Sequence, residues 1–216
     1  MARSRCRYGL WSAISLIVGL AVPGACDVVE DFAADAEAGR FALTLARQAL
    51  EAYTLRRERI PTPDDLPDLL RQRSGAFVSA VQGDAPRCCM GSLHPTQPTL
   101  ADEIIQAAVA AAGLDSRKPP LEPEELPELR LIVSIVAPPE SIIDPRRVDP
   151  VRAGLAARGR ERWGVVLPGE TRRLDRAIRW ARIRARAEEG EAVEYFRVRA
   201  FRVMEPSQFG DAVSAR

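Results

Sequence analysis

The sequence predicts an α+β fold: a single compact domain with a largely antiparallel sheet and flanking helices, preceded by an N-terminal signal segment. Strand-like and helix-like segments follow one another in mixed order over 216 residues, and no internal repeat is present. This length suits one well-buried domain and is too short for two large ones. The 46% apolar and 28% charged residues are ordinary for globular proteins, which excludes disordered, collagen-like and coiled-coil chains.

Residues 1–25 have the order of a secretory signal peptide. Arg3, Arg5 and Arg7 give a positively charged start, and an uncharged, mostly apolar run follows over residues 10–22. That run has 13 residues, whereas a helix needs about 20 to cross the hydrocarbon core of a bilayer. We therefore predict a cleaved signal peptide, with an uncleaved membrane anchor as the alternative.

The predicted cleavage site decides how the mature chain is held. Cleavage before Cys26 would make this cysteine the lipidated first residue of a bacterial lipoprotein, although Pro23 stands where a leucine-like residue is usual. Ordinary cleavage near Gly24 or Ala25 is the alternative. In both cases we expect an exported chain on the periplasmic side of the cell envelope. A lipidated Cys26 would add a membrane tether.

The charge balance excludes a strongly basic nucleic-acid-binding protein. After removal of the signal, 28 positive and 30 negative side chains remain, a net charge of −2. An arginine-rich segment over residues 172–188 is interrupted by acidic residues, and helical spacing spreads its charges around the helix. We predict that it is a solvated helix face, with anionic lipid head groups as the alternative partner.

The mature chain is predicted to form one domain over residues 27–206, followed by a flexible tail over residues 207–216. Apolar residues at helical spacing predict three helices, over residues 27–59, 100–113 and 172–188. Thr99 is placed to cap the second helix, with Asp102 as its capping-box partner and Gly113 as its end.

Five strands are predicted from β-branched and apolar runs, over residues 75–81, 87–90, 129–136, 163–167 and 196–200. The strand over 129–136 is apolar at nearly every position, so we expect it to be buried on both faces. Four prolines between residues 119 and 127 predict an extended connection before it. The glutamates of that connection, at positions 122, 124, 125 and 128, are expected to be solvated.

A series of short motifs then follows in order along the chain: GAFV (75–78), RCCMG (87–91), PTQP (95–98), DSRKPPL (115–121), EELP (124–127) and YFRV (195–198). Through these motifs the stretch from Gly75 to Val203 resembles the AMMECR domain family, whose bacterial members are called AmmeMemoRadiSam system protein A. The resemblance implies an α+β fold with a cleft near the second motif. It also implies an association of relatives with a Memo-like protein and a radical SAM protein.

The family hallmark Leu-Arg-Gly-Cys-Ile-Gly is matched here at Arg87, Cys89 and Gly91. Cys88 stands in place of the central glycine, and Lys118 stands where relatives usually carry phenylalanine. A glycine often marks a positive φ or a close approach of two backbones, which cysteine tolerates poorly. We therefore expect the exchange at Cys88 to alter any activity that needs a bare backbone at this position.

Two side chains of this hallmark are candidates for catalysis. Arg87 and Cys89 are two residues apart, so an extended strand would place them on one face. A neighbouring guanidinium favours the thiolate, which is the reactive form of cysteine. The alternative is a buried structural cysteine, because free cysteine is among the most buried residue types.

Four further residues are candidates for binding in the groove near the hallmark, namely Gly91, His94, Asp115 and Arg117. Asp115 and Arg117 are predicted to form an ion pair that shapes the cleft wall, and His94 to lie in a surface loop. His94 is the single histidine, and the spacing of Cys88, Cys89 and His94 matches no recognised metal site, so we expect neither a metal nor a cofactor.

Two functional hypotheses follow from these residues. The first is an exported binding or accessory module that presents the groove around Arg87 and Cys89 to a peptide or protein partner, because the chain contains no complete catalytic set. The second is a cysteine-dependent enzyme or redox component that uses Cys89 with Arg87. The family resemblance would link it to Memo-like and radical SAM proteins.

Overall fold

The protein is described by a computed structural model that covers residues 27–83 and 85–206. Within these residues, eight strands form two four-stranded sheets, and every strand pair is antiparallel. The predicted α+β class with antiparallel pairing is therefore confirmed, with the strands divided between two sheets. The predicted signal over residues 1–25, lipidation of Cys26 and the flexible tail over 207–216 lie outside the described residues.

The first sheet has the order β2-β1-β3-β8 and the second the order β4-β7-β5-β6. The strands of the first are β1 (Gly75–Gln82), β2 (Ala85–Gly91), β3 (Leu129–Val136) and β8 (Ala200–Met204). Those of the second are β4 (Glu140–Ile142), β5 (Gly154–Arg158), β6 (Trp163–Val166) and β7 (Glu194–Val198).

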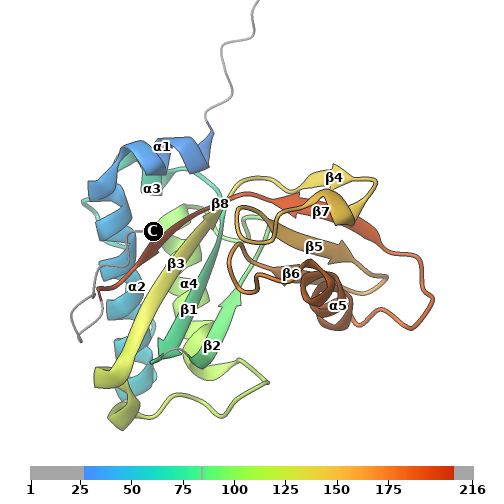
Figure 1. Ribbon diagram of the computed structural model, residues 1–216. Coiled ribbons are helices and arrows are strands. Elements are labelled where there is room, and N and C mark those ends of the chain that lie inside the picture. The colour runs from blue at the N-terminus through green and yellow to red at the C-terminus, as the bar shows by residue number, and fades with distance from the viewer. Residues whose placement is uncertain (1–26, 84, 207–216) are drawn as a thin grey trace, which may run out of the picture.

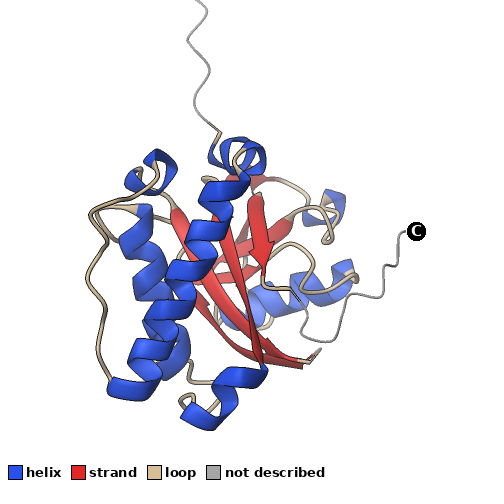
Figure 2. Cartoon of the chain, turned by 90° about the vertical axis from the view of Figure 1, so that its left-hand side faces the viewer, coloured by secondary structure: helices blue, strands red, loops and turns tan. Residues whose placement is uncertain are grey.

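Helices cover the outer face of each sheet (Figure 1). They are α1 (Val28–Ala34), α2 (Ala36–Arg56), α3 (Asp68–Arg71), α4 (Leu100–Gly113) and α5 (Leu174–Arg184), with short 3-10 turns η1 (Pro123–Glu128) and η2 (Pro145–Arg147). The long helices α2 and α4 lie together across the first sheet (Figure 2). Helix α5 packs on the second sheet, against β5 and β6. In the described part of the chain, no helix has both the length and the apolar character needed to span a membrane.

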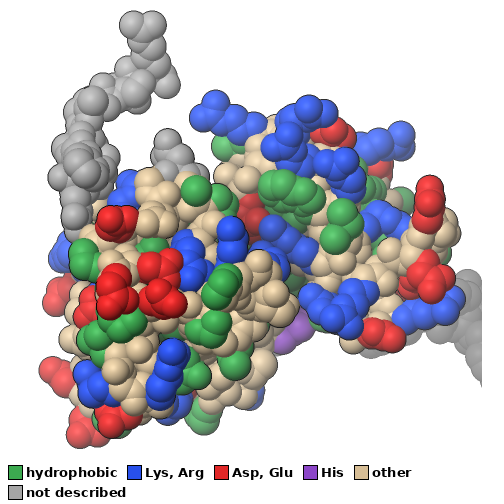
Figure 3. Space-filling model, turned by 90° about the horizontal axis from the view of Figure 1, so that it is seen from below, with side chains coloured by type: hydrophobic (Ala, Val, Ile, Leu, Met, Phe, Trp, Pro, Cys, Tyr) green, Lys and Arg blue, Asp and Glu red, His purple; other side chains and the backbone are tan. Residues whose placement is uncertain are grey.

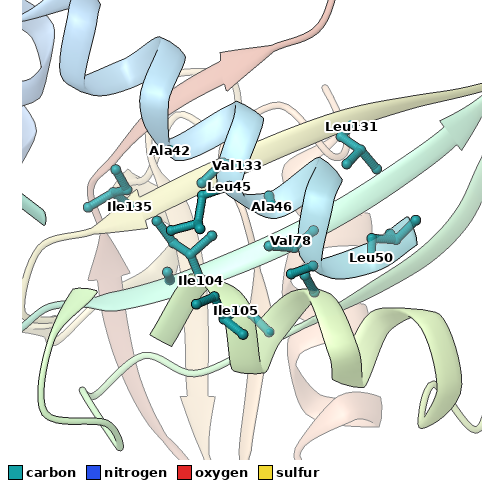
Figure 4. Packing of buried hydrophobic residues seen from close by; sticks show 14 of the residues in the cluster. Ala42, Leu45, Ala46, Leu50, Val78, Ile104, Ile105, Leu131, Val133 and Ile135 are labelled. Carbon is teal, nitrogen blue, oxygen red and sulfur yellow. The ribbon is translucent and has the colours of Figure 1, made fainter. Parts of the chain in front are cut away.

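The main core lies between the first sheet and helices α2 and α4. Leu45 of α2 and Ile104 of α4 are fully buried and point toward Val133 of β3 (Figure 4). Burial of each such side chain stabilises the fold by about 1.5–3 kcal/mol. The Thr99 cap predicted for α4 is present, because its hydroxyl accepts a hydrogen bond of 3.1 Å from the backbone N–H of Asp102.

A second apolar layer joins the two sheets. Phe77 and Val136 of the first sheet pack against Ala156 and Val198 of the second. The strand β3 therefore has helices on one side and the second sheet on the other. This explains why seven of its eight residues are buried, as its continuous apolar sequence predicts.

The helix predicted over residues 27–59 is instead two helices. Asp35 leaves the helical conformation between α1 and α2, and its carboxylate accepts hydrogen bonds from the backbone N–H groups of Glu37 (3.0 Å) and Ala38 (2.9 Å). A side chain that caps a new helix competes with continuation of the old one. The chain then ends α2 at Arg56, with Arg57 in the left-handed conformation.

Three further predictions are corrected. The connection after Pro119 is not wholly extended, because residues 123–128 form the 3-10 turn η1. The helix predicted over 172–188 is shorter, from Leu174 to Arg184. The single closing strand is two strands in different sheets, separated by Arg199, which pairs with Asp27 at 2.6 Å. The strand β4 and the helix α3 carry too few residues for periodicity to reveal them, and β5 (GLAAR) lacks the β-branched and aromatic residues typical of strands.

Gly164 sets how closely α5 approaches the second sheet. A Cβ atom at this position would lie 2.0 Å from the carbonyl oxygen of Ala181 and 2.3 Å from the backbone nitrogen of Ala185. Both contacts are with helix backbone, so no flexible side chain can move aside. The absence of a side chain at Gly164 therefore allows α5 to pack directly on the backbone of β6.

We expect Gly164→Ala to lower the free energy of unfolding by about 2 kcal/mol, because the added methyl group forces the helix away from the sheet. Urea unfolding followed by circular dichroism measures this loss. Gly190→Ala is the matched control, since no atom lies within 4 Å of its added Cβ and only its positive φ of 79° is strained. That strain costs about 1 kcal/mol. Equal losses in the two variants would contradict the packing argument.

Candidate functional site

The hallmark residues lie on β2, an edge strand of the first sheet. The pairing of β1 with β2 shifts by one residue, because Ala80 lies opposite Cys88 whereas Val81 lies opposite Pro86. Arg87 is thus the extra residue of a β-bulge. The two cysteines that follow point to opposite faces: Cys88 belongs to the core beneath the helices, and Cys89 to the layer between the sheets. Both thiols are free.

Asp115 and Arg117 close the open edge of β2 at Cys89. A carboxylate oxygen of Asp115 accepts a hydrogen bond of 2.9 Å from the backbone N–H of Cys89, while Arg117 donates one of 2.7 Å to the carbonyl oxygen of Cys89. The two side chains are themselves joined by an ion pair of 2.6 Å. The predicted ion pair is therefore present, and we call this arrangement the edge clamp. It satisfies both backbone groups that an edge residue would otherwise leave unpaired.

The edge clamp is strong because its carboxylate is almost completely enclosed. The side chain of Asp115 is only 5% exposed, whereas that of Arg117 is 50% exposed. Burial alone would raise the pKa of Asp115, but hydrogen bonds from Arg117 and from the backbone of Cys89 outweigh it and hold the pKa below its usual value. The same pairing raises the pKa of Arg117.

Arg87 acts on a different segment. Its guanidinium donates to both carboxylate oxygens of Glu125 and to the carbonyl oxygens of Pro119 (3.1 Å) and Pro120 (3.3 Å). These bonds fasten the proline-rich connection to β2, and they raise the pKa of Arg87 and lower that of Glu125. The expectation that Glu125 is solvated is therefore wrong, because Arg87 binds it from the bulge.

The thiol of Cys89 does not have the depressed pKa that a neighbouring arginine would give. It is half-buried, its sulfur lies 3.1 Å from the hydroxyl of Ser79, and burial raises its pKa more than Arg117 and Arg184 lower it. Burial likewise raises the pKa of Cys88 to about 11, although Arg87 partly offsets it. Both side chains are thiols rather than thiolates at neutral pH.

Two hollows meet at the edge clamp. The first, which we call the inner cavity, has a volume of about 430 Å³, and the second, the outer groove, about 520 Å³. They share five residues: Cys89, Asp115, Arg117, Glu170 and Arg184. The candidate catalytic pair is brought to the inner cavity, since Arg87 and Cys89 both line it. Gly91 and His94 line the outer groove.

Gly91 has a clear structural reason to be glycine. A Cβ atom there would lie 2.1 Å from the carbonyl oxygen of Ala76 and 2.5 Å from the Cα of Phe77 on the neighbouring strand. Cys88, by contrast, has no positive φ and lies opposite Ala80 of β1, directly after the bulge. The backbone at Cys88 is therefore one that cysteine adopts freely, whereas the expected effect of Cys88 on activity stays a prediction.

His94 lies exposed in a loop, as predicted, and its ring packs edge-on against Trp163 of β6 with centroids 5.4 Å apart. The loop is held by Glu103 of α4, whose buried carboxylate accepts hydrogen bonds from the backbone N–H groups of Thr96 (2.7 Å) and Gln97 (2.9 Å). Sequence reasoning missed Glu103, because an acidic residue beside an apolar stripe resembles any solvated helix position.

Helix α5 and strand β8 supply residues that sequence reasoning did not assign to the site. Arg184 of α5 forms an ion pair of 2.8 Å with Glu170 and lies over the ring of Trp180 at 5.5 Å. Arg202 of β8 donates to the carbonyl oxygen of Pro168. No motif marks these residues, since they meet Cys89 only because the two sheets pack together. Among the described residues, no three His, Cys, Asp or Glu side chains form a group that could hold a metal ion.

The charged state of Asp115 makes the edge clamp dependent on pH. An unfolded aspartate has a pKa of about 3.9, and the folded pKa of Asp115 is lower. Its stabilising contribution is therefore full above about pH 5 and is lost as the pH falls through the folded value.

We expect Asp115→Asn to lower the free energy of unfolding at pH 7 by about 2 kcal/mol, because the guanidinium of Arg117 loses its charged partner. Urea unfolding measures this loss. We also expect this difference from wild type to shrink between about pH 5 and pH 2. Asp68→Asn is the control, since its carboxylate is fully exposed. A difference that stays constant across this pH range would contradict the assignment.

Comparison with known proteins gives this arrangement a family. Residues 43–203 match the family described as AMMECR1. A protein of Methanothermobacter thermautotrophicus is 41% identical over 104 residues, covering 48% of this chain and 54% of the relative. A protein of Thermotoga maritima is 37% identical over 125 residues, covering 57% and 72%. The chain therefore spans about half the length of the first of these relatives.

The fold has a counterpart among solved structures. The crystal structure of the uncharacterized protein PH0010 from Pyrococcus horikoshii superposes with a TM-score of 0.69 at 28% sequence identity, covering 81% of this chain and 94% of that one. Since the family match extends over most of the chain and includes β2 and the edge clamp, this protein belongs to the AMMECR1 family.

Proposed function

We propose that this chain is a binding or accessory module that holds a segment of a peptide or protein partner in the inner cavity and the outer groove. The observation that carries this proposal is the edge clamp. It fixes Cys89 by both backbone groups and gives the two hollows a common rigid wall. A wall held in advance reduces the entropy that a ligand must lose on binding.

The edge clamp also limits how a partner can be held. A peptide commonly adds to an exposed sheet edge through backbone hydrogen bonds. At Cys89 those bonds are already made to Asp115 and Arg117. The partner is therefore held by side-chain contacts within the hollows, where Trp180 and Ile132 offer apolar surface.

The state of the thiol supports binding over catalysis. Burial raises the pKa of Cys89, its sulfur lies against Ser79, and His94 packs on Trp163. A cysteine nucleophile needs a depressed pKa or an adjacent base. The cysteine-dependent enzyme is kept as a second candidate because Cys89 lines both hollows, which would give a substrate access to it.

The test is selection of binding peptides from a random nonapeptide library on the full chain, followed by affinity measurement with the synthesised peptides. We expect Trp180→Ala to weaken their binding at least tenfold, because it removes apolar surface from the inner cavity. Ile183→Ala, on the same helix and 63% exposed, should leave it unchanged.

Cys89→Ser separates the two candidate functions. A binding module keeps its affinity with serine at this position, and iodoacetamide modifies the wild-type thiol slowly at pH 7.5 because little thiolate is present. Rapid modification, or selected peptides that bind equally well to Trp180→Ala, would count against the proposal.

We also propose that the module acts at the cell envelope, tethered through Cys26. Support comes from Asp27, which follows the predicted lipidation site directly. Its carboxylate accepts a hydrogen bond of 3.1 Å from the backbone N–H of Val29 in α1 and pairs with Arg199 at 2.6 Å. Such a tether would hold the domain against the membrane without a spacer.

Mass spectrometry of the mature protein tests this location. We expect the first residue to be Cys26 carrying a diacylglycerol mass, and Cys26→Ser to release the protein from the membrane fraction. An N-terminus that retains Met1 without lipid would overturn the envelope location and leave the binding proposal standing.

A further inference from the structure

We infer that the inner cavity binds an oxyanion, so that the partner segment proposed above is acidic. This inference rests on the proposed binding function and names the chemistry of its ligand. Three features support it: the charges that line the cavity, the ion pairs that neutralise some of these charges, and the apolar surface beside them.

Cations outnumber acids around the inner cavity. Five positive side chains line it, from four different parts of the chain: Arg87, Arg117, Lys118, Arg184 and Arg202. Among the described residues, two carboxylates line it with them, those of Asp115 and Glu170. Figure 3 shows many arginine side chains over the half of the molecule that carries α5, which forms one side of this cavity. The cavity is therefore a local region of positive potential in a chain whose net charge is close to zero.

Three of these cations are already neutralised within the fold. Arg87 is paired with Glu125, Arg117 with Asp115, and Arg184 with Glu170, at 2.5, 2.6 and 2.8 Å. These three pairs use both carboxylates of the cavity. They therefore shape its wall, and no carboxylate of the described residues forms an ion pair with the remaining two cations.

Lys118 and Arg202 carry the uncompensated charge. Within residues 27–83 and 85–206, neither forms an ion pair with a carboxylate. Arg202 uses one nitrogen, Nη1, to donate to the carbonyl oxygen of Pro168, which leaves Nε and Nη2 as donors. Together the two side chains provide two positive charges and several N–H donors for an oxyanion.

The pKa of Arg202 is lowered, as expected for a partly buried guanidinium that has no ion-pair partner among the described residues. Burial lowers it, and the charge of Glu170, which pairs with Arg184, only partly offsets this effect. Arg87 and Arg117, which have carboxylate partners, show the opposite direction. An anion beside Arg202 would restore the balance that the other arginines obtain from the fold.

Apolar surface lies next to this charge. Trp180, Ile132 and Val81 line the same cavity, whose volume of about 430 Å³ is within the range that accommodates a small ligand or a few peptide side chains. Lys118 precedes two prolines, which stiffen the segment that holds it. The combination fits a carboxylate flanked by an apolar side chain better than an extended phosphodiester backbone, which requires an open basic surface.

The first experiment uses succinate and inorganic phosphate as probes, titrated into the full chain at low ionic strength with calorimetric detection. We expect both anions to bind. We expect Lys118→Gln and Arg202→Gln each to weaken binding about tenfold, because each removes one charge-assisted hydrogen bond. Arg179→Gln, which removes an exposed arginine of α5 outside the cavity, should leave the affinity unchanged. Lys118→Arg and Arg202→Lys keep the charge and should retain most of it, which shows that the loss does not come from misfolding.

The second experiment identifies the source of the oxyanion with the peptides selected above. Three variants of each peptide are compared with the unmodified peptide. The first replaces an acidic side chain by its amide, the second replaces the C-terminal carboxylate by an amide, and the third replaces the acidic residue by phosphoserine. A loss of at least tenfold in one of the amide arms on wild type marks the carboxylate that is bound, and a gain of at least tenfold in the phosphoserine arm marks a phosphate. Either change should be small on the Lys118→Gln, Arg202→Gln double variant.

Separate results decide the two proposals. Selected peptides that bind in the cavity but are neutral, with affinities unaffected in the double variant, overturn the oxyanion inference and leave the binding module intact. Anions that bind through Lys118 and Arg202 while no peptide is ever selected overturn the peptide partner instead. Equal anion affinity in wild type and the double variant would also end the oxyanion inference.

Discussion

The backbone of Cys89 at the edge of the first sheet is the constraint on which the site depends. An edge strand leaves alternate N–H and C=O groups without partners, and here Asp115 and Arg117 supply them from the segment after α4. The same two side chains separate the inner cavity from the outer groove. The edge clamp therefore both closes the edge of β2 and forms the wall that the two hollows share. A change at Asp115 alters stability and the shape of both hollows together.

A one-residue bulge explains why the hallmark carries two kinds of contact. In a regular strand, the side chains of Arg87 and Cys89 would lie on the same face of the sheet. Because of the bulge, Arg87 binds Glu125 in the proline-rich segment instead. Arg87 then positions the segment that carries Lys118, whereas Cys89 faces the layer between the sheets. The exchange of glycine for Cys88 is compatible with this geometry, because its side chain enters the core on the opposite face.

Local features of the sequence were sufficient for part of this structure. The Thr99 cap, the strand over 129–136 and the pair of Asp115 with Arg117 were predicted because each depends on residues close together in the chain. The bulge at Arg87 was not, since only the register with β1 reveals it. Arg202 reaches the site through the passage of the chain from β7 to β8 and the packing of two sheets, which no local pattern encodes.

The charge of the whole chain conceals that of the cavity. Arginines and carboxylates nearly cancel in number, so composition indicates no anionic partner. In the fold, carboxylates such as Glu125 and Asp115 form ion pairs that hold the proline-rich segment and the cavity wall. Lys118 and Arg202 line the same cavity and have no carboxylate partner in the part of the chain that the structure describes. A thiol beside them stays protonated because burial outweighs the nearby guanidinium groups. The inner cavity is therefore suited to attract a negative charge rather than to carry out nucleophilic attack. This property arises because three of its cations form ion pairs with carboxylates and two do not.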